Sequence, residues 1–217
     1  MYDDLAAFMP HFYFILQGVT VTLQYSVSAV CFGLVIGTLL AICKVVDIRI
    51  LRIFAHAYTS IFRGTPLLLQ LTIVYFGLPG ILGVKLSVFA AGVLAFSLNS
   101  GAYVSEIIRA GIASVDKGQV EAAKALGITP VLRMKDIILP QAFRNILPTL
   151  VNELITLVKE SALISVIGGM DLMKRAQAVA AETYSFFTPM IVAAAAYYIL
   201  VLIISSFAMI LEKRLAL

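Results

Sequence analysis

Three ionisable side chains lie inside an apolar stretch of the chain. Glu153, Lys159 and Glu160 all fall within residues 146–170. A charge near the centre of a bilayer costs about 2.5–3.5 kcal/mol on insertion scales, so such residues normally face a partner helix or a water-filled cavity. Glu153 and Glu160 are two helical turns apart and share one face. That face could bind a polar solute, or it could only join helices through ion pairs.

A second polar stripe occurs in the apolar segment 86–108. Asn99, Tyr103 and Glu106 follow the i, i+4, i+7 spacing of one helix face, with Ser100 at its edge. We expect the two stripes to meet about halfway across a membrane and to line a pocket for a small polar solute. The alternative is a network of Glu–Lys or Glu–Tyr contacts that only stabilises helix packing.

Composition places these residues in a membrane protein. The 217 residues are 61% hydrophobic and only 13% charged, whereas a soluble domain carries roughly 25% charged residues. The net charge of +4 comes without any cluster of Lys and Arg interleaved with aromatics, which excludes a nucleic-acid-binding protein. The chain contains neither H-E-x-x-H nor G-x-S-x-G, so we expect no enzyme, and the isolated His11 and His56 suggest no metal site.

Five apolar segments are each long enough to cross a bilayer. They lie within residues 12–43, 53–82, 86–108, 146–170 and 186–211. We therefore expect an all-α integral membrane protein with five transmembrane helices. Pro66 lacks an N–H group and disfavours a helical conformation at Thr65, so the second span should be kinked or restarted there.

The basic residues predict the orientation. Twelve of the 16 Lys and Arg residues fall on one side if the N-terminus is outside and the C-terminus inside. The other side then holds only Lys85, Lys174 and Arg175, and Lys159 lies inside a span. Because cytoplasmic loops carry the excess of basic residues, we expect an N-out, C-in topology in which the segment 111–144 faces the cytoplasm.

That cytoplasmic segment contains the sequence EAAKALGITPVLRMKDIILP at 121–140. It fits the pattern EAA-x3-G-x9-I-x-L-P at every fixed position, which are Glu121, Ala122, Ala123, Gly127, Ile137, Leu139 and Pro140. The segment resembles the ATPase-coupling loop of type I ABC importer permeases. The resemblance implies that this loop is a pair of cytoplasmic coupling helices that docks on a separate nucleotide-binding subunit.

Local signals support a rigid structure for the loop. The Ala-rich stretch 120–126 favours a helix, and Gly127 can end it in a left-handed conformation. Thr129 and Pro130 can begin a second helix as N-cap and first residue, and Pro140 marks a turn toward the fourth span. No G-x4-G-K-[ST] phosphate loop occurs, so ATP and Mg²⁺ should be used by the partner ATPase and no cofactor by this chain.

Further blocks narrow the resemblance to one subfamily. The sequences FRGTPLLLQ, NSGAY, EIIRAG and KESAL, which begin at Phe62, Asn99, Glu106 and Lys159, are similar to those of the polar amino acid uptake permeases, the histidine, arginine, lysine, glutamine and cystine group. The likeness implies one ABC transmembrane type-1 domain over residues 1–217, with a core at about 18–211 and the coupling loop at about 111–144.

The two polar stripes suggest roles for individual residues in the expected pocket. Asn99 and Ser100 would bind the α-amino or α-carboxylate group of the substrate, while Glu153 faces its side chain. The full set of substrate-binding candidates is Asn99, Ser100, Tyr103, Glu153, Gln70 and Thr65, and the gate candidates are Lys159, Glu160 and Ser161.

Glu153 predicts the class of amino acid. A buried carboxylate stabilises a cationic side chain and repels an anionic one, which favours arginine, lysine or histidine. A Glu153 that is protonated or paired with Lys159 would not select charge, and an importer for glutamine, glutamate or cystine is the alternative. A more remote alternative is a secondary transporter or channel that needs no ATPase.

Five helices with one polar face cannot enclose a translocation path alone. We therefore expect a second permease subunit, either a copy of this chain or a paralogue. The resemblance implies two ATPase subunits on the cytoplasmic side, an extracytoplasmic amino acid-binding protein, and a location in the bacterial inner membrane. Transport would proceed by alternating access.

Overall fold

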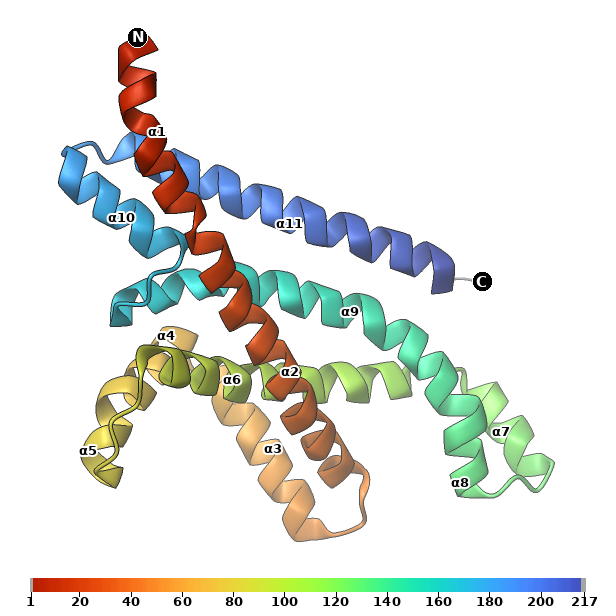
Figure 1. Ribbon diagram of the computed structural model, residues 1–217. Coiled ribbons are helices and arrows are strands. Elements are labelled where there is room, and N and C mark those ends of the chain that lie inside the picture. Colours follow the sequence, from red (N-terminus) through yellow and green to blue (C-terminus); the bar gives the residue numbers. More distant parts are fainter. Residues whose placement is uncertain (1, 216–217) are drawn as a thin grey trace.

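The computed structural model describes residues 2–215, and all regular elements in this range are helices (Figure 1). The first predicted span is formed by α1 (Tyr2–Leu16) and α2 (Gly18–Val45), which meet at Gln17. Together they provide a 38-residue apolar stretch from Phe8 to Val45. This length exceeds what a perpendicular crossing of the bilayer requires.

The second predicted span is broken. Helix α3 (Arg49–Gly64) is followed by α4 (Leu67–Thr72), the π-helical turn η1 (Ile73–Gly77) and α5 (Leu78–Leu82), and the chain bends by 103° between α3 and the segment after it. Thr65 and Pro66 at the break have extended backbones. The predicted restart at Pro66 is confirmed, because proline removes a helix donor and forces the preceding residue out of the helical region.

Helix α6 (Val88–Ala113) is the centre of the bundle. It begins at Ser87, whose hydroxyl accepts a hydrogen bond of 3.1 Å from the backbone N–H of Ala90. It packs against α2, α3, α4 and α9, so both polar stripes predicted from the sequence lie on neighbouring helices.

The coupling segment consists of α7 (Lys117–Ala125) and α8 (Pro130–Leu132), and Figure 1 shows both at the end of the α6–α9 pair opposite α4 and α5. Gly127 has φ +71, which confirms its left-handed role after α7. The second helix begins at Pro130 with Thr129 as N-cap, although the Thr129 side chain makes no capping hydrogen bond.

The prediction that Pro140 marks a turn is wrong. Helix α8 continues through the π-helical segment η2 (Arg133–Ile138) directly into α9 (Leu139–Glu160), and Pro140 lies in the first turn of α9. A π-helical stretch shifts the backbone hydrogen bonds of the helix, so a residue without an N–H group can be tolerated just after it. One unbroken helical rod therefore runs from the coupling segment into the bundle.

The chain after α9 forms elements that apolarity did not predict. A 3₁₀ turn, η3 (Ser161–Ile167), ends at Gly168 with φ +89, and α10 (Leu172–Thr183) precedes the last span, α11 (Phe187–Leu215). Asp171 caps α10 by accepting from the N–H of Lys174 at 2.9 Å and also accepts from the Tyr197 hydroxyl at 2.9 Å. Burial raises the pKa of the Asp171 carboxyl, although these donors partly oppose the rise.

Length and apolarity identify three spans among the described residues, namely Phe8–Val45, Val88–Ala113 and Phe187–Ile210. A fourth is present if the bent pair counts as one crossing. Helix α9, which corresponds to the fourth span expected from the sequence, is not in this set. It carries several of the polar residues on which the functional hypothesis depends.

Glycines allow α2 and α6 to approach closely. A Cβ atom placed on Gly37 of α2 would lie 2.6 Å from the Cβ of Val104, and one on Gly101 of α6 would lie 2.5 Å from the side chain of Ile36. Gly33 faces Ser100 in the same way. Small residues are common where membrane helices pack tightly, because the attraction there is van der Waals contact rather than exclusion of water.

Replacing Gly37 by alanine should therefore destabilise the protein by about 1–3 kcal/mol, because the added methyl group overlaps Val104 and the backbone of Gly101. The melting temperature of the detergent-solubilised protein measures this. Gly80→Ala is the matched control, since no atom of the described residues lies within 4 Å of its added Cβ. Equal melting temperatures for the two variants would contradict close packing of α2 on α6.

Candidate substrate path and coupling surface

Three of the predicted substrate residues meet at the break between α3 and α4. The Gln70 side-chain amide donates to the carbonyl oxygens of Phe62 (2.9 Å) and Thr65 (3.1 Å) and to the Thr65 hydroxyl (2.8 Å). Asn99 of α6 donates to the Phe62 carbonyl at 3.1 Å and to Gln70 Oε1 at 3.0 Å. These contacts satisfy backbone groups that the break leaves without helical partners, and they fix α6 against the bend.

Ser100 and Glu153 form a second pair of candidates between α6 and α9. Ser100 is fully buried, and its hydroxyl has no hydrogen-bond partner among the described residues. The Ser100 side chain faces Gly33 of α2, so it lies in the packed contact between α2 and α6. Glu153 is half-buried on α9, the helix that packs against both α2 and α6.

The gate candidates lie where α9 changes into the 3₁₀ turn. Lys159 is exposed, Glu160 is half-buried and Ser161 is fully buried, with its hydroxyl donating to the Val158 carbonyl at 2.8 Å. The three residues therefore mark a change of helix type, and such irregular turns are frequent at functional hinges.

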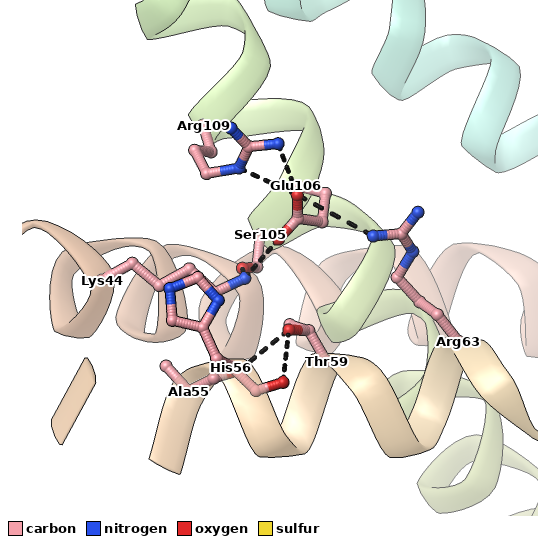
Figure 2. Close-up of polar contacts among 8 residues, drawn as sticks. All are labelled: Lys44, Ala55, His56, Thr59, Arg63, Ser105, Glu106 and Arg109. Carbon is pink, nitrogen blue, oxygen red and sulfur yellow. Dashed lines mark hydrogen bonds and ion pairs between the residues drawn. The ribbon is translucent and has the colours of Figure 1, made fainter. Parts of the chain in front are cut away.

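Glu106, at the lower end of the stripe predicted on α6, belongs to a cluster of charges (Figure 2). Its Oε1 atom pairs with Lys44 Nζ of α2 at 2.5 Å, and that ammonium also donates to Ser105 Oγ at 2.7 Å. Its Oε2 atom accepts from Arg109 at 2.8 and 2.9 Å. Arg63 of α3 approaches the same oxygen at 3.8 Å. One carboxylate thus joins α2, α3 and α6.

Lys44 is the most deeply buried of the Glu106 partners that sequence reasoning missed. It directly follows the first predicted span and was counted among the cytoplasmic basic residues, yet its side chain is 3% exposed. Its partner is 62 residues away. The only sequence signal was Glu106 itself, an acidic residue inside an apolar segment that requires a counter-charge.

A cavity of about 410 Å³ opens beside the cluster. Its polar lining residues are Arg63, Tyr103, Glu106, Ser114, Asn145 and Thr149, contributed by α3, α6 and α9 and by the residue that ends α6. Tyr103, which was predicted to bind substrate with Asn99, lies here instead of at the break, and the Arg63 guanidinium stands 5.5 Å from its ring centre.

Most residues of the coupling motif are exposed, and they lie above a small apolar core. Glu121 and Ala122 are exposed, as are Gly127, Leu139 and Pro140; Ile137 is half-exposed, whereas Ala123 is buried. Two large apolar side chains are highly exposed on it, Leu126 at 79% and Val131 at 75%. Exposed apolar side chains on a polar cytoplasmic segment indicate a partner protein.

One side-chain hydrogen bond attaches this surface to the bundle, and a second joins the end of α6 to α9 next to it. Gln141 of α9 donates to Gln119 of α7 at 2.7 Å, and Asn145 donates to Ser114 at 2.8 Å. Beneath them a small apolar core contains Val115, Ile138, Ala142 and Ile146. Helix α7 is therefore packed against the ends of α6 and α9 rather than carried on a loop without contacts.

Comparison with known proteins agrees with this arrangement. A family model described as the inner membrane component of binding-protein-dependent transport systems matches residues 33–217. A putative glutamine transport system permease protein, GlnP, of Rickettsia conorii is 64% identical over 99% of both chains. The arginine transport system permease protein ArtQ of Bacillus subtilis is 52% identical over 98% of this chain and 97% of its own.

Solved structures share the fold. A crystal structure of an amino acid ABC transporter with histidines matches with a TM-score of 0.92 and 42% identity, over 99% of this chain and 98% of that one. The match confirms the prediction of an all-α transmembrane domain of the type I ABC importer class. Because the family model spans most of the chain and the relatives match nearly end to end, the chain belongs to the inner membrane components of binding-protein-dependent transport systems, and it is a transport subunit rather than an enzyme.

Proposed function

We propose that this chain is the permease subunit of an ABC importer for polar amino acids, with a preference for those with a basic side chain. The observation that carries this proposal is the position of Glu153, a half-buried carboxylate on α9, the helix that packs against the polar stripe-bearing helix α6. A carboxylate in a partly desolvated site attracts a guanidinium, ammonium or imidazolium group much more strongly than it would in water.

Glutamine is the second candidate substrate. The relatives at 64% and 52% identity are named for glutamine and arginine respectively, so the comparisons support an amino acid without separating these two. The structure with 42% identity is described with histidines, which supports a site that accepts a basic side chain. A protonated Glu153 would be able to donate to the amide oxygen of glutamine.

The proposed complex contains further chains. Permeases of this family work with an ATPase and a binding protein, and the exposed coupling surface around Leu126 provides the place for the ATPase. A second permease subunit is supported by α9, where Asn152 and Lys159 are exposed and Glu153 is only half-buried. Polar groups at this depth are costly against lipid, so they should face a second polar surface across a shared path.

The coupling surface can be tested without disturbing the fold. Leu126→Asp and Glu121→Lys change exposed side chains, so the protein should still insert and fold, but the ATPase subunit should no longer copurify and ATP-driven uptake should fall at least tenfold. Glu182→Lys on α10, distant from the coupling segment in Figure 1, is the charge-reversal control and should retain uptake. Undiminished uptake after removal of residues 121–127 would instead identify a transporter that needs no ATPase.

The substrate preference can be tested in vesicles that contain the complete complex. Glu153→Gln should lower ATP-driven arginine uptake about 10- to 100-fold, because the variant loses one hydrogen bond between charged groups. Glutamine uptake should change less. The charge-removal control is Glu182→Gln, whose side chain is 71% exposed. Unchanged arginine uptake by Glu153→Gln rules out selection of the substrate's charge by this residue.

A further inference from the structure

The Glu106 cluster beside the cavity has more positive charge than its carboxylate neutralises. Lys44, Arg63 and Arg109 surround the single acidic group, Glu106 (Figure 2). Lys44 and Arg109 each hold one of its oxygens within hydrogen-bond distance. Arg63 is 3.8 Å away, beyond that distance, so it adds charge without forming a direct hydrogen bond.

Arg63 is positioned to receive an anion. Its side chain is 45% exposed and lines the cavity of about 410 Å³ together with Glu106, and its guanidinium lies over the Tyr103 ring at 5.5 Å from the ring centre. A guanidinium has five N–H donors in a planar fork that fits a carboxylate with two parallel hydrogen bonds. Asn145 and Thr149 of α9 add polar side chains to the lining of the cavity.

The cavity also lies on the route that a substrate would take. Tyr103 follows Asn99 by one helical turn on α6, and Thr149 precedes Glu153 by one turn on α9. Tyr103 and Thr149 therefore both lie one turn closer than Asn99 and Glu153 to the coupling segment, on the side expected to face the cytoplasm. A solute leaving the neighbourhood of Glu153 would therefore meet this cavity about 5 Å further along.

We propose that Arg63 binds the α-carboxylate of the amino acid in this cavity, as an exit site on the cytoplasmic side of Glu153. This inference rests on the proposed function, because it takes the solute to be an amino acid. Glu153 would select the side chain, and Arg63 would recognise the carboxylate that all α-amino acids share. Arg109 provides the internal comparison, since it binds Glu106 more closely than Arg63 does but lines a different, apolar cavity with Thr38 and Ile42.

The test measures ligand binding to the solubilised complex of this chain with its ATPase, without nucleotide. The probes are L-arginine and L-glutamine, each compared with its decarboxylated analogue, agmatine or 4-aminobutanamide. The wild type should bind the amino acids more tightly than the analogues. Arg63→Gln should weaken binding of the amino acids about tenfold or more and leave the analogues unaffected, and Arg63→Lys, which keeps the charge but loses the planar fork, should recover part of the loss.

Arg109→Gln is the matched control, because it removes the same charge from the same Glu106 oxygen. It should leave binding of the amino acids and the analogues unchanged. The proposal is overturned if the wild type does not distinguish amino acids from their analogues, if Arg63→Gln weakens both classes equally, or if Arg109→Gln has the same effect as Arg63→Gln. ATP-driven amino acid uptake by the wild type distinguishes failure of the exit-site proposal from failure of the proposed function. Absence of this uptake would refute the proposed function itself.

Discussion

Lys44 and Glu106 place opposite charges in the packed region between α2 and α6, where water cannot solvate the ammonium. Only 3% of the Lys44 side chain is exposed, and Ser105 provides its second hydrogen bond. Because a buried ion that loses its partner costs about 3–5 kcal/mol, the pair fixes the register of the two helices. The glycines at 37 and 101 allow the backbones to come close enough for this contact. The α2–α6 unit thus serves as the frame on which α3, α9 and the coupling helices are arranged.

The parts of the fold that the sequence predicted correctly depend on local signals. Gly127 and Pro66 act on the backbone within a few residues, so the end of α7 and the break after α3 could be located without knowledge of the rest of the chain. Pro140 was misread because a proline in the first turn of a helix and a proline after a helix give the same local signal. Helix α10 was missed because it is not apolar enough to be a span, and polar helices outside the membrane have no composition signal of that kind.

The candidate site was predicted as a set of residues, but their partners were not. Helical periodicity correctly placed Asn99, Tyr103 and Glu106 on one side of α6, since that depends only on spacing. Their contacts depend on chain segments far away in sequence, at Gln70 and Lys44, and periodicity contains no information about those. The single stripe is therefore divided into three environments along its length. Asn99 stabilises the broken span, Tyr103 lines a cavity with Arg63, and Glu106 joins three helices through ion pairs.

The placement of the candidate residues on different helices suggests how an ATPase bound at the coupling segment could act on the substrate. Glu153 and the second half of the coupling motif belong to one helical rod, which extends without a break from Pro130 to Glu160. A rotation of the coupling segment about the axis of this rod would therefore also displace Glu153. The α2–α6 unit, held by its buried ion pair, is a separate packed unit against which the rod lies. A substrate bound between the rod and this unit would lie at the boundary that such a displacement would change, which would suit the alternating access expected from the sequence.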